Sequence, residues 1–216
     1  LIHENTPERA DPDRPAVLLL HGLGSSHAGT YMTSIAGALL AQGCRVFRAD
    51  LPGAGPSYRT TSLPPHGACY DLVRESLNWL SQTLSIPRWR LAGVSLGGNL
   101  LLKMLAESSR HPKRYPLKFE VDRAIAVAPP IDLAECCRNM EIGINRLYAN
   151  YFLRALKKQA NMRADLWPEW KKVLAGADYS TVRRFDDTVT SRLAGFQDAD
   201  DYYDAGSSTS VLKHIA

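Results

Sequence analysis

The sequence predicts an α/β protein with a mostly parallel, doubly wound sheet that carries helices on both faces. Short apolar runs of strand length alternate with stretches of helical periodicity, which is typical of parallel strands joined by right-handed crossovers. The predicted strands cover residues 16–20, 44–49, 89–94 and 122–128, and the predicted helices cover residues 31–42, 69–84 and 96–108. At 216 residues, the chain suits one domain, or one domain with an inserted subdomain.

The first elements surround two glycine-rich loops. The apolar run at 16–20 ends in His21-Gly22-Leu23-Gly24, a turn signal, and the helix after it stops at Gly43. The strand at 44–49 leads into residues 50–57, which hold too much Gly and Pro for a regular element.

The next elements are better marked. The helix at 69–84 is amphipathic, and Pro87 marks its stop. Its stripe consists of Leu72, Val73, Ser76, Leu77, Leu80 and Leu84. The strand at 89–94 passes almost directly into the helix at 96–108, and the strand at 122–128 is closed by two prolines.

The pattern changes after Asp132. We expect a helical cap insertion over about 132–176, because this stretch contains no good strand. Its helical stripe is formed by Leu147, Tyr151, Phe152, Ala155 and Leu156, and its large aromatic residues are Tyr148, Tyr151, Phe152, Trp167 and Trp170. These aromatic residues either line an acyl pocket or pack the core of the insertion itself. The polar and aromatic stretch from Tyr179 to Tyr203 is expected to be solvated loop.

Composition excludes several classes of protein. The net charge of +4 is mild, and the basic clusters at 110–118 and 154–163 are interpreted as solvated faces, so no nucleic-acid partner is expected. No apolar run reaches the roughly 18 residues of a membrane span, so stable membrane insertion is not expected. No G-x-G-x-x-G opens a helix after the first strand, which argues against a dinucleotide-binding domain.

The cysteines indicate neither a disulfide framework nor a metal site. No C-x-x-C pair is present, and no histidine lies at ligand spacing from a cysteine. The four are Cys44, Cys69, Cys136 and Cys137. We expect reduced thiols, a cytoplasmic location, no metal and no cofactor. The chain begins with Leu rather than Met, so a removed targeting segment stays open as an alternative.

The residues Gly93-Val94-Ser95-Leu96-Gly97 match the G-x-S-x-G pattern of a nucleophile elbow. The pattern alone is weak, but here a strand runs directly into it and a helix runs directly out. The two glycines allow a sharp turn that projects the Ser95 hydroxyl above the sheet. The sequence therefore predicts an α/β-hydrolase fold with Ser95 as the catalytic nucleophile, the alternative being an N-capping serine.

The His21-Gly22 turn occupies the place of an oxyanion loop. It follows its own strand about 70 residues before the serine, and in this fold that loop supplies one backbone donor. The two predicted donors are the N–H groups of Leu23 and of Leu96, which stabilise the oxygen anion formed on attack of a carbonyl. His21 is expected to brace this loop rather than to act as the general base.

The chain resembles the YheT-like branch of the α/β-hydrolases, a group of esterases. The matching residues are His21-Gly22-Leu23-Gly24-Ser25-Ser26 with Tyr31, the 50–57 loop, Gly93 to Asn99 with Lys103, Pro130 to Leu133, Tyr151 to Leu153, Phe185-Asp186, Gly195-Phe196, Asp201 to Tyr203 and Ser207. One departure is Pro52, where the family loop usually carries Arg, which puts a loop-bracing ion pair in doubt.

A catalytic histidine and acid are not evident after Ser95. His111 and His214 are the only later histidines, and neither is a convincing base. The resemblance implies that the acid and the histidine follow two further strands, so we interpret the chain as a truncated domain with an open sheet edge. Asp132 is a rival acid, although a turn or an N-cap is its favoured role.

The predicted activity is hydrolysis of a small or lipid-like carboxylic ester through an acyl-enzyme on Ser95. A thioesterase or an acyltransferase would use the same residues, and a non-catalytic binding protein would keep the pocket without the base. Acyl-chain length and oligomeric state are not readable from the sequence.

Overall fold

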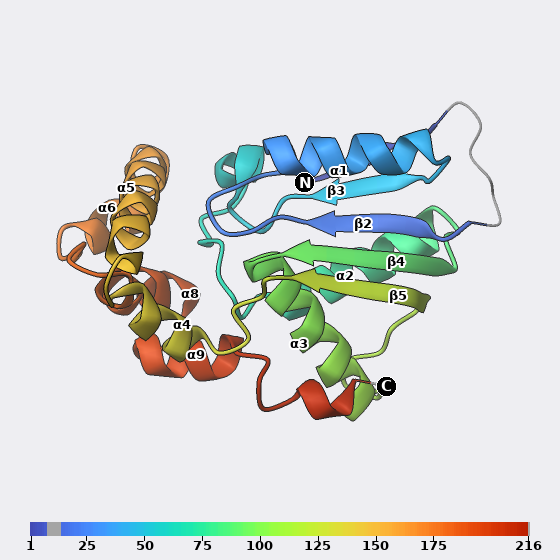
Figure 1. Cartoon of the computed structure of the whole chain (residues 1–216). Helices are drawn as coiled ribbons and strands as arrows, with labels where there is room; N and C mark the ends of the chain where they lie inside the picture. Colours follow the sequence, from blue (N-terminus) through green and yellow to red (C-terminus); the bar gives the residue numbers. More distant parts are fainter. Residues whose placement is uncertain (8–13, 216) are drawn as a thin grey trace.

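Within residues 1–7 and 14–215, which the computed structural model describes, five strands form one sheet. They are β1 (Ile2–Asn5), β2 (Ala16–Leu20), β3 (Val46–Ala49), β4 (Arg88–Val94) and β5 (Glu120–Val127). Their order is β1-β3-β2-β4-β5, with β1 antiparallel to β3 and the other pairs parallel. The predicted parallel sheet is confirmed (Figure 1).

The helical elements follow the predicted alternation up to α3. They are α1 (Thr30–Ala41), η1 (Gly55–Arg59), α2 (Tyr70–Thr83), α3 (Leu96–Arg110), α4 (Leu133–Met140), α5 (Asn145–Ala164), α6 (Pro168–Leu174), α7 (Val182–Phe185), η2 (Asp186–Thr190), α8 (Ser191–Ala194), α9 (Ala199–Gly206) and η3 (Leu212–His214). Helices α4 to α9 gather beyond the arrowheads of β2, β4 and β5, at the carboxyl edge of the sheet (Figure 1).

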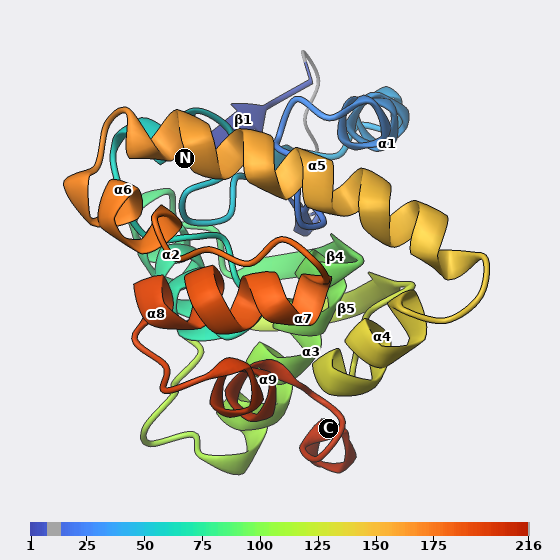
Figure 2. The ribbon, with the colours of Figure 1, turned by 90° about the vertical axis from the view of Figure 1, so that its left-hand side faces the viewer.

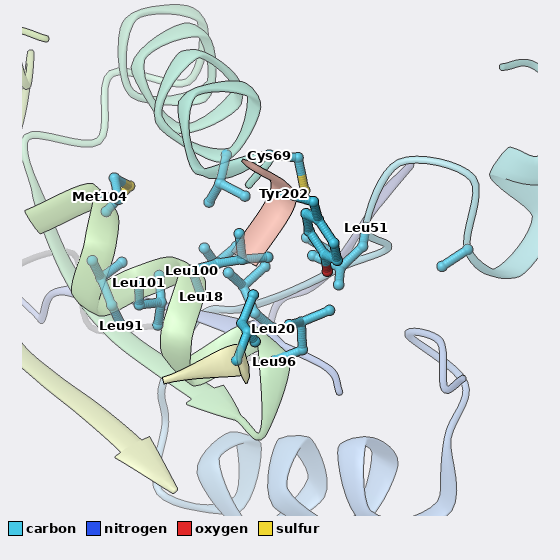
Figure 3. Packing of buried hydrophobic residues seen from close by; sticks show 14 of the residues in the cluster. Leu18, Leu20, Leu51, Cys69, Leu91, Leu96, Leu100, Leu101, Met104 and Tyr202 are labelled. Carbon is cyan, nitrogen blue, oxygen red and sulfur yellow. The ribbon is translucent and has the colours of Figure 1, made fainter. Parts of the chain in front are cut away.

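The sheet is covered on both faces because β2 alternates its side chains between two apolar clusters. Val17 and Leu19 pack with Met32 of α1 on one face. Leu18 and Leu20 belong to the larger cluster on the opposite face, which includes residues of α2 and α3 (Figure 3). Full burial of one such leucine side chain contributes about 2 kcal/mol, so the alternation fixes which side of the strand each helix covers.

Strand β1 was missed by sequence reasoning because it lies in a polar stretch. It pairs with β3 in the register Ile2 to Ala49 through Asn5 to Val46. At the edge of the sheet, polar side chains are tolerated, and Glu4 forms an ion pair of 2.6 Å with Arg45.

The expectation of solvated loop from Tyr179 to Tyr203 is wrong. Helix α7, a π-helical turn η2 and helix α8 follow one another without a break, and Figure 2 shows them as one helical segment. Its buried side chains recur at helical spacing, at Val182, Phe185 and Val189. The acids that suggested a loop make local hydrogen bonds instead. Asp198, for example, accepts a hydrogen bond from the Asp201 N–H at 2.9 Å and caps α9.

The helical layer also extends past the predicted boundary at residue 176, since α9 ends at Gly206. Its status as an insertion stays a prediction.

At the other edge of the sheet, β5 pairs with β4 alone among the described residues. Ile125 and Val127 are 60% and 51% exposed there, and the truncation of the domain stays a prediction. No helix within the described ranges is both long and apolar enough to cross a bilayer.

Candidate active site

Ser95 occupies a strained turn between β4 and α3. Its backbone angles are φ 52° and ψ −123°, a conformation that non-glycine residues rarely adopt and that costs on the order of 1–3 kcal/mol. The Ser95 N–H donates to the Val127 carbonyl at 2.8 Å, which ties the turn to the end of β5. The residue is exposed, so its hydroxyl is accessible.

Glycines on both sides of Ser95 make this turn possible. A Cβ at Gly97 would lie 2.6 Å from the His21 carbonyl oxygen, and a Cβ at Gly93 would lie 2.5 Å from the Gly97 carbonyl carbon. Both contacts are with backbone, which cannot swing aside as a side chain can. The motif spacing therefore reflects three segments packed more closely than any Cβ permits.

The loop 21–29, which we call the oxyanion loop, lies directly against the serine. A Cβ at Gly22 would approach the Ser95 Cβ to 3.0 Å. The Gly22 N–H already donates to the Tyr31 hydroxyl at 2.9 Å, so it is not available to a ligand. In the described part of the chain, the N–H groups of Leu23 and Leu96 donate to no protein acceptor. These two amides are the predicted oxyanion donors.

His21 holds the loop in place as a neutral imidazole. Its side chain is fully buried, its Nδ1 lies 2.7 Å from the Gly22 carbonyl oxygen, and its Nε2 lies 3.1 Å from the Leu51 nitrogen. Because the Leu51 N–H must donate, Nε2 is the acceptor and Nδ1 carries the proton. Burial lowers the pKa of His21, which favours this neutral form. Both ring nitrogens are occupied, which agrees with a bracing role.

A second histidine cluster supports the same loop from the side of β1. Buried Asp50 accepts from the His27 backbone N–H at 2.7 Å and lies 2.9 Å from its Nδ1. The His27 ring stacks on that of His3, with centroids 3.4 Å apart and planes 12° from parallel. Ligand atoms of His3, His27 and Asp50 lie within 4.8 Å of one another, close enough for a metal ion, but nearly parallel rings do not direct their nitrogen lone pairs at one point.

Ser95 opens into a largely apolar pocket of about 310 Å³ between the sheet edge and the helical layer. Its lining residues are Leu23, Ser95, Leu96, Ala128, Pro129, Pro130, Leu133, Cys136, Cys137, Met140, Tyr148, Phe152, Val182, Asp186, Tyr202 and Tyr203. The pocket thus brings together the predicted nucleophile, both predicted amide donors and residues from α4, α5, α7 and α9.

The cap aromatic residues divide between the two roles that the sequence left open. Tyr148 and Phe152 line the Ser95 pocket. Trp167 and Trp170 instead belong to or pack against the large apolar cluster, and their indole N–H groups donate to backbone carbonyls of the 58–62 segment, outside the cap, at 2.9 and 2.6 Å. Tyr151 is 71% exposed and lines neither the pocket nor the core.

A buried acid in the pocket, Asp186, was named in the sequence only as a residue that matches the resembling family, with no role assigned to it. Asp186 accepts hydrogen bonds from the Thr190 hydroxyl at 2.7 Å and from the Tyr203 hydroxyl at 2.8 Å. The Tyr203 oxygen also lies 3.1 Å from the Cys137 sulfur. Burial raises the pKa of Asp186 to about 6, because the charged form loses its solvation. The π-helical turn that begins at Asp186 is the local signal, since such turns often mark functional sites.

The rival acid and the later histidines lie elsewhere. Asp132 accepts from the Glu135 N–H at 2.8 Å and caps α4, and it does not line the pocket. His111 follows the last residue of α3, about 24 Å along the helix from Ser95. His214 belongs to η3, which packs against α3. All six histidines fall within the described ranges, and none lines the Ser95 pocket.

Two motif residues on α3 anchor the elbow helix to the end of the cap. The Asn99 amide donates to the Gly206 carbonyl at 2.8 Å, and Lys103 Nζ donates to the Ser207 carbonyl at 2.7 Å. The Ser207 hydroxyl in turn accepts from the Leu133 N–H at 2.9 Å. These residues position the elbow helix, and none of the three lines the pocket.

The combination of a parallel sheet, a strained serine elbow and a facing glycine loop defines a hydrolase-type α/β fold. A family model described as the alpha/beta hydrolase fold matches residues 15–165, and the chain belongs to this family.

The chain is similar to YheT of Escherichia coli strain K12, with 30% identity over 94% of this chain and 58% of that protein. It is 26% identical to a monoacylglycerol lipase of Saccharomyces cerevisiae, over 92% of this chain and 44% of that one. It is 28% identical to the human phospholipase ABHD3, over 94% and 48% respectively. The chain therefore spans about half the length of the curated relatives it matches.

Solved structures match the chain at lower similarity. Est1E of Butyrivibrio proteoclasticus, solved with ferulic acid, matches with a TM-score of 0.49 and 15% identity, over 64% of this chain and 52% of that one. A serine hydrolase homologue of Coxiella burnetii matches with a TM-score of 0.46 and 20% identity, over 60% and 57%.

Proposed function

We propose that the protein is a carboxylic ester hydrolase in which Ser95 forms an acyl-enzyme. The Ser95 Oγ attacks the ester carbonyl carbon while a general base takes its proton, and the C–O bond to the alcohol breaks as the alcohol receives that proton. Water then adds to the acyl-enzyme and releases the carboxylic acid and free Ser95. In this proposal the base is a histidine, and no histidine of the described residues lines the Ser95 pocket.

The observation that carries this proposal is the strained backbone of Ser95 at the floor of an open apolar pocket. Ser95 is strained, exposed and flanked by two close-packed glycines, which suits a nucleophile. A plain turn would not need backbone strain of this kind. The unpaired amides of Leu23 and Leu96 beside it suit a developing oxyanion. One such donor typically lowers the barrier by about 3 kcal/mol.

The apolar pocket and the relatives favour a lipid-like ester as substrate. Apart from Asp186 and two cysteines, the walls that surround Ser95 consist mostly of aliphatic and aromatic side chains. Two relatives carry the names monoacylglycerol lipase and phospholipase. A thioesterase or acyltransferase would use the same serine and donors, and would differ only in the leaving or accepting group.

A non-catalytic binding protein is the second candidate, and a specific observation favours it. The pocket holds no histidine from the described part of the chain, so a protein without a base from elsewhere would bind acyl groups without cleaving them.

Labelling of the full-length protein by a fluorophosphonate probe separates the two candidates, because only an activated serine reacts readily. We expect rapid labelling of the wild type, no labelling of Ser95→Ala, and full labelling of Ser109→Ala, an exposed serine at the far end of α3. An unlabelled wild type would favour the binding protein. Labelling that persists in Ser95→Ala would disprove the role of Ser95.

A further inference from the structure

A second, larger pocket lies on the other side of the oxyanion loop, under α5. Its volume is about 550 Å³. Its lining residues are Gly24, Ser25, Ser26, Ala28, Gly29, Gly53, Gly55, Tyr58, Ala155, Lys158, Gln159, Met162 and Arg163. Figure 2 shows α5 lying across this side of the molecule. The chemistry proposed for Ser95 makes no use of this pocket.

The pocket wall carries positive charge without a matching acid. Lys158 and Arg163 line it, and no Asp or Glu is among its lining residues. Helix α5, which supplies both, contains five basic residues and no acidic one over its 20 residues. The pocket is therefore a region of positive potential that attracts anions.

Arg163 is unusual because it is a buried cation that lacks a carboxylate partner in the described ranges. It is 3% exposed, and its guanidinium donates to the carbonyls of Gly53 and Gln159 and lies 5.0 Å from the Trp170 ring. Its Nε finds no hydrogen-bond acceptor. Burial without a counter-charge lowers its pKa to about 10. Buried charges are normally paired, so this one favours an anionic ligand nearby.

The two pockets share the oxyanion loop as a common wall. Leu23 lines the Ser95 pocket, and the next residue, Gly24, lines the second pocket. Helix α5 likewise contributes Phe152 to the first and Lys158 to the second. The two pockets therefore lie against neighbouring residues of one loop and of one helix.

We infer that this second pocket binds the phosphate group of an acyl ester whose alcohol part is phosphorylated. A phosphate presents several oxygens and up to two negative charges, which suits two cations together with the Ser25 and Ser26 hydroxyls that line the same pocket. The inference rests on the proposed function of Ser95 for the turnover of such an ester, but not for the binding of the phosphate.

Binding is tested with glycerol phosphate, which carries the headgroup chemistry and no acyl ester, by isothermal titration calorimetry on the full-length protein. Lys158→Gln should weaken binding about tenfold, the value of one charge-assisted contact. The matched control is Lys157→Gln, the adjacent exposed lysine, whose Nζ lies 5.0 Å from the Tyr179 ring and outside the pocket. It should change binding by less than about twofold. Equal weakening in both variants, or no binding to the wild type, overturns the site.

Turnover distinguishes a substrate subsite from a site for free phosphate. Lys158→Gln should raise KM about tenfold for a short-chain ester of glycerol phosphate and leave KM unchanged for the same ester of glycerol. If inorganic phosphate binds as tightly as glycerol phosphate and both esters keep their KM values in Lys158→Gln, the substrate assignment is overturned. Ser95→Ala should bind glycerol phosphate normally, so failure of the nucleophile assignment would leave this site standing.

Discussion

The close packing of Gly97 allows a sharp test of the elbow. A Cβ added there would lie 2.6 Å from the His21 carbonyl oxygen and 2.7 Å from that of Leu20. Both atoms are backbone, at the end of β2 and the start of the oxyanion loop, so relief requires α3 and β2 to move apart. Overpacking of this kind costs typically 1–3 kcal/mol, and backbone neighbours place Gly97→Ala at about 3 kcal/mol.

Gly37→Ala provides a matched control within a helix. Gly37 is exposed in α1, and a Cβ there would meet no atom within 4 Å. Alanine at such a position stabilises a helix by about 0.5–1 kcal/mol. The same chemical change should therefore raise the free energy of unfolding at residue 37 and lower it at residue 97.

The free energy of unfolding is measured by urea denaturation followed by far-ultraviolet circular dichroism. We expect the two variants to differ by about 4 kcal/mol, the sum of the two opposite effects. Gly97→Ala should also slow fluorophosphonate labelling of Ser95 by about 100-fold, because displacement of His21 displaces the Leu23 amide. If Gly97→Ala is as stable as Gly37→Ala, the packing argument for the motif is wrong.

Two further predictions concern residues in the Ser95 pocket. Ser95→Gly should abolish fluorophosphonate labelling. It should also raise the free energy of unfolding in urea by about 1 kcal/mol, because glycine adopts φ 52° without strain. A lower free energy of unfolding would contradict the strain at Ser95. The pKa of Asp186 is raised from 3.8 to about 6, so the folded protein binds this proton more tightly than the unfolded chain does. The free energy of unfolding should therefore fall by about 3 kcal/mol as pH rises through that interval. In Asp186→Asn this loss between pH 4 and 6 should disappear from the urea midpoints, whereas an unchanged pH profile would exclude Asp186 as its source.

The parts of the site that follow from backbone geometry were predictable from the sequence. Gly93, Ser95 and Gly97 stand at fixed spacing between a strand and a helix, and this local context defines the turn. The oxyanion loop is similarly local, since His21 and Gly22 directly end β2. Neighbours in the chain determine these features, so no knowledge of distant contacts is needed.

The polar network of the pocket could not be predicted in this way. Asp186, Tyr203 and Cys137 meet from η2, α9 and α4, and no spacing in the sequence relates them. Tyr202 and Tyr203 are buried although their segment is rich in acids, and the composition of that segment suggested loop. Tertiary packing overrides local polarity here, because the acids cap helices or accept buried hydrogen bonds.

The second pocket was hidden from sequence reasoning for a related reason. A basic run on a helix most often marks a solvated face, and Lys157 fits that interpretation. Arg163 lies six residues further along the same helix and is buried. The surroundings of Arg163 are set by the 53–58 loop, which α5 covers. That loop is about 110 residues away in the sequence, so the sequence around Arg163 does not show whether a carboxylate lies nearby.

The elbow and the cap depend on each other through α3. The strained turn at Ser95 persists only if its surroundings fix it more firmly than the strain can relax it. On one side this support is the Val127 carbonyl at the end of β5. On the other it is the clamp of Asn99 and Lys103 on the carbonyls that end α9. Because the far end of the cap is bonded to the helix that carries the serine, α9 acts as a fixed support of the elbow.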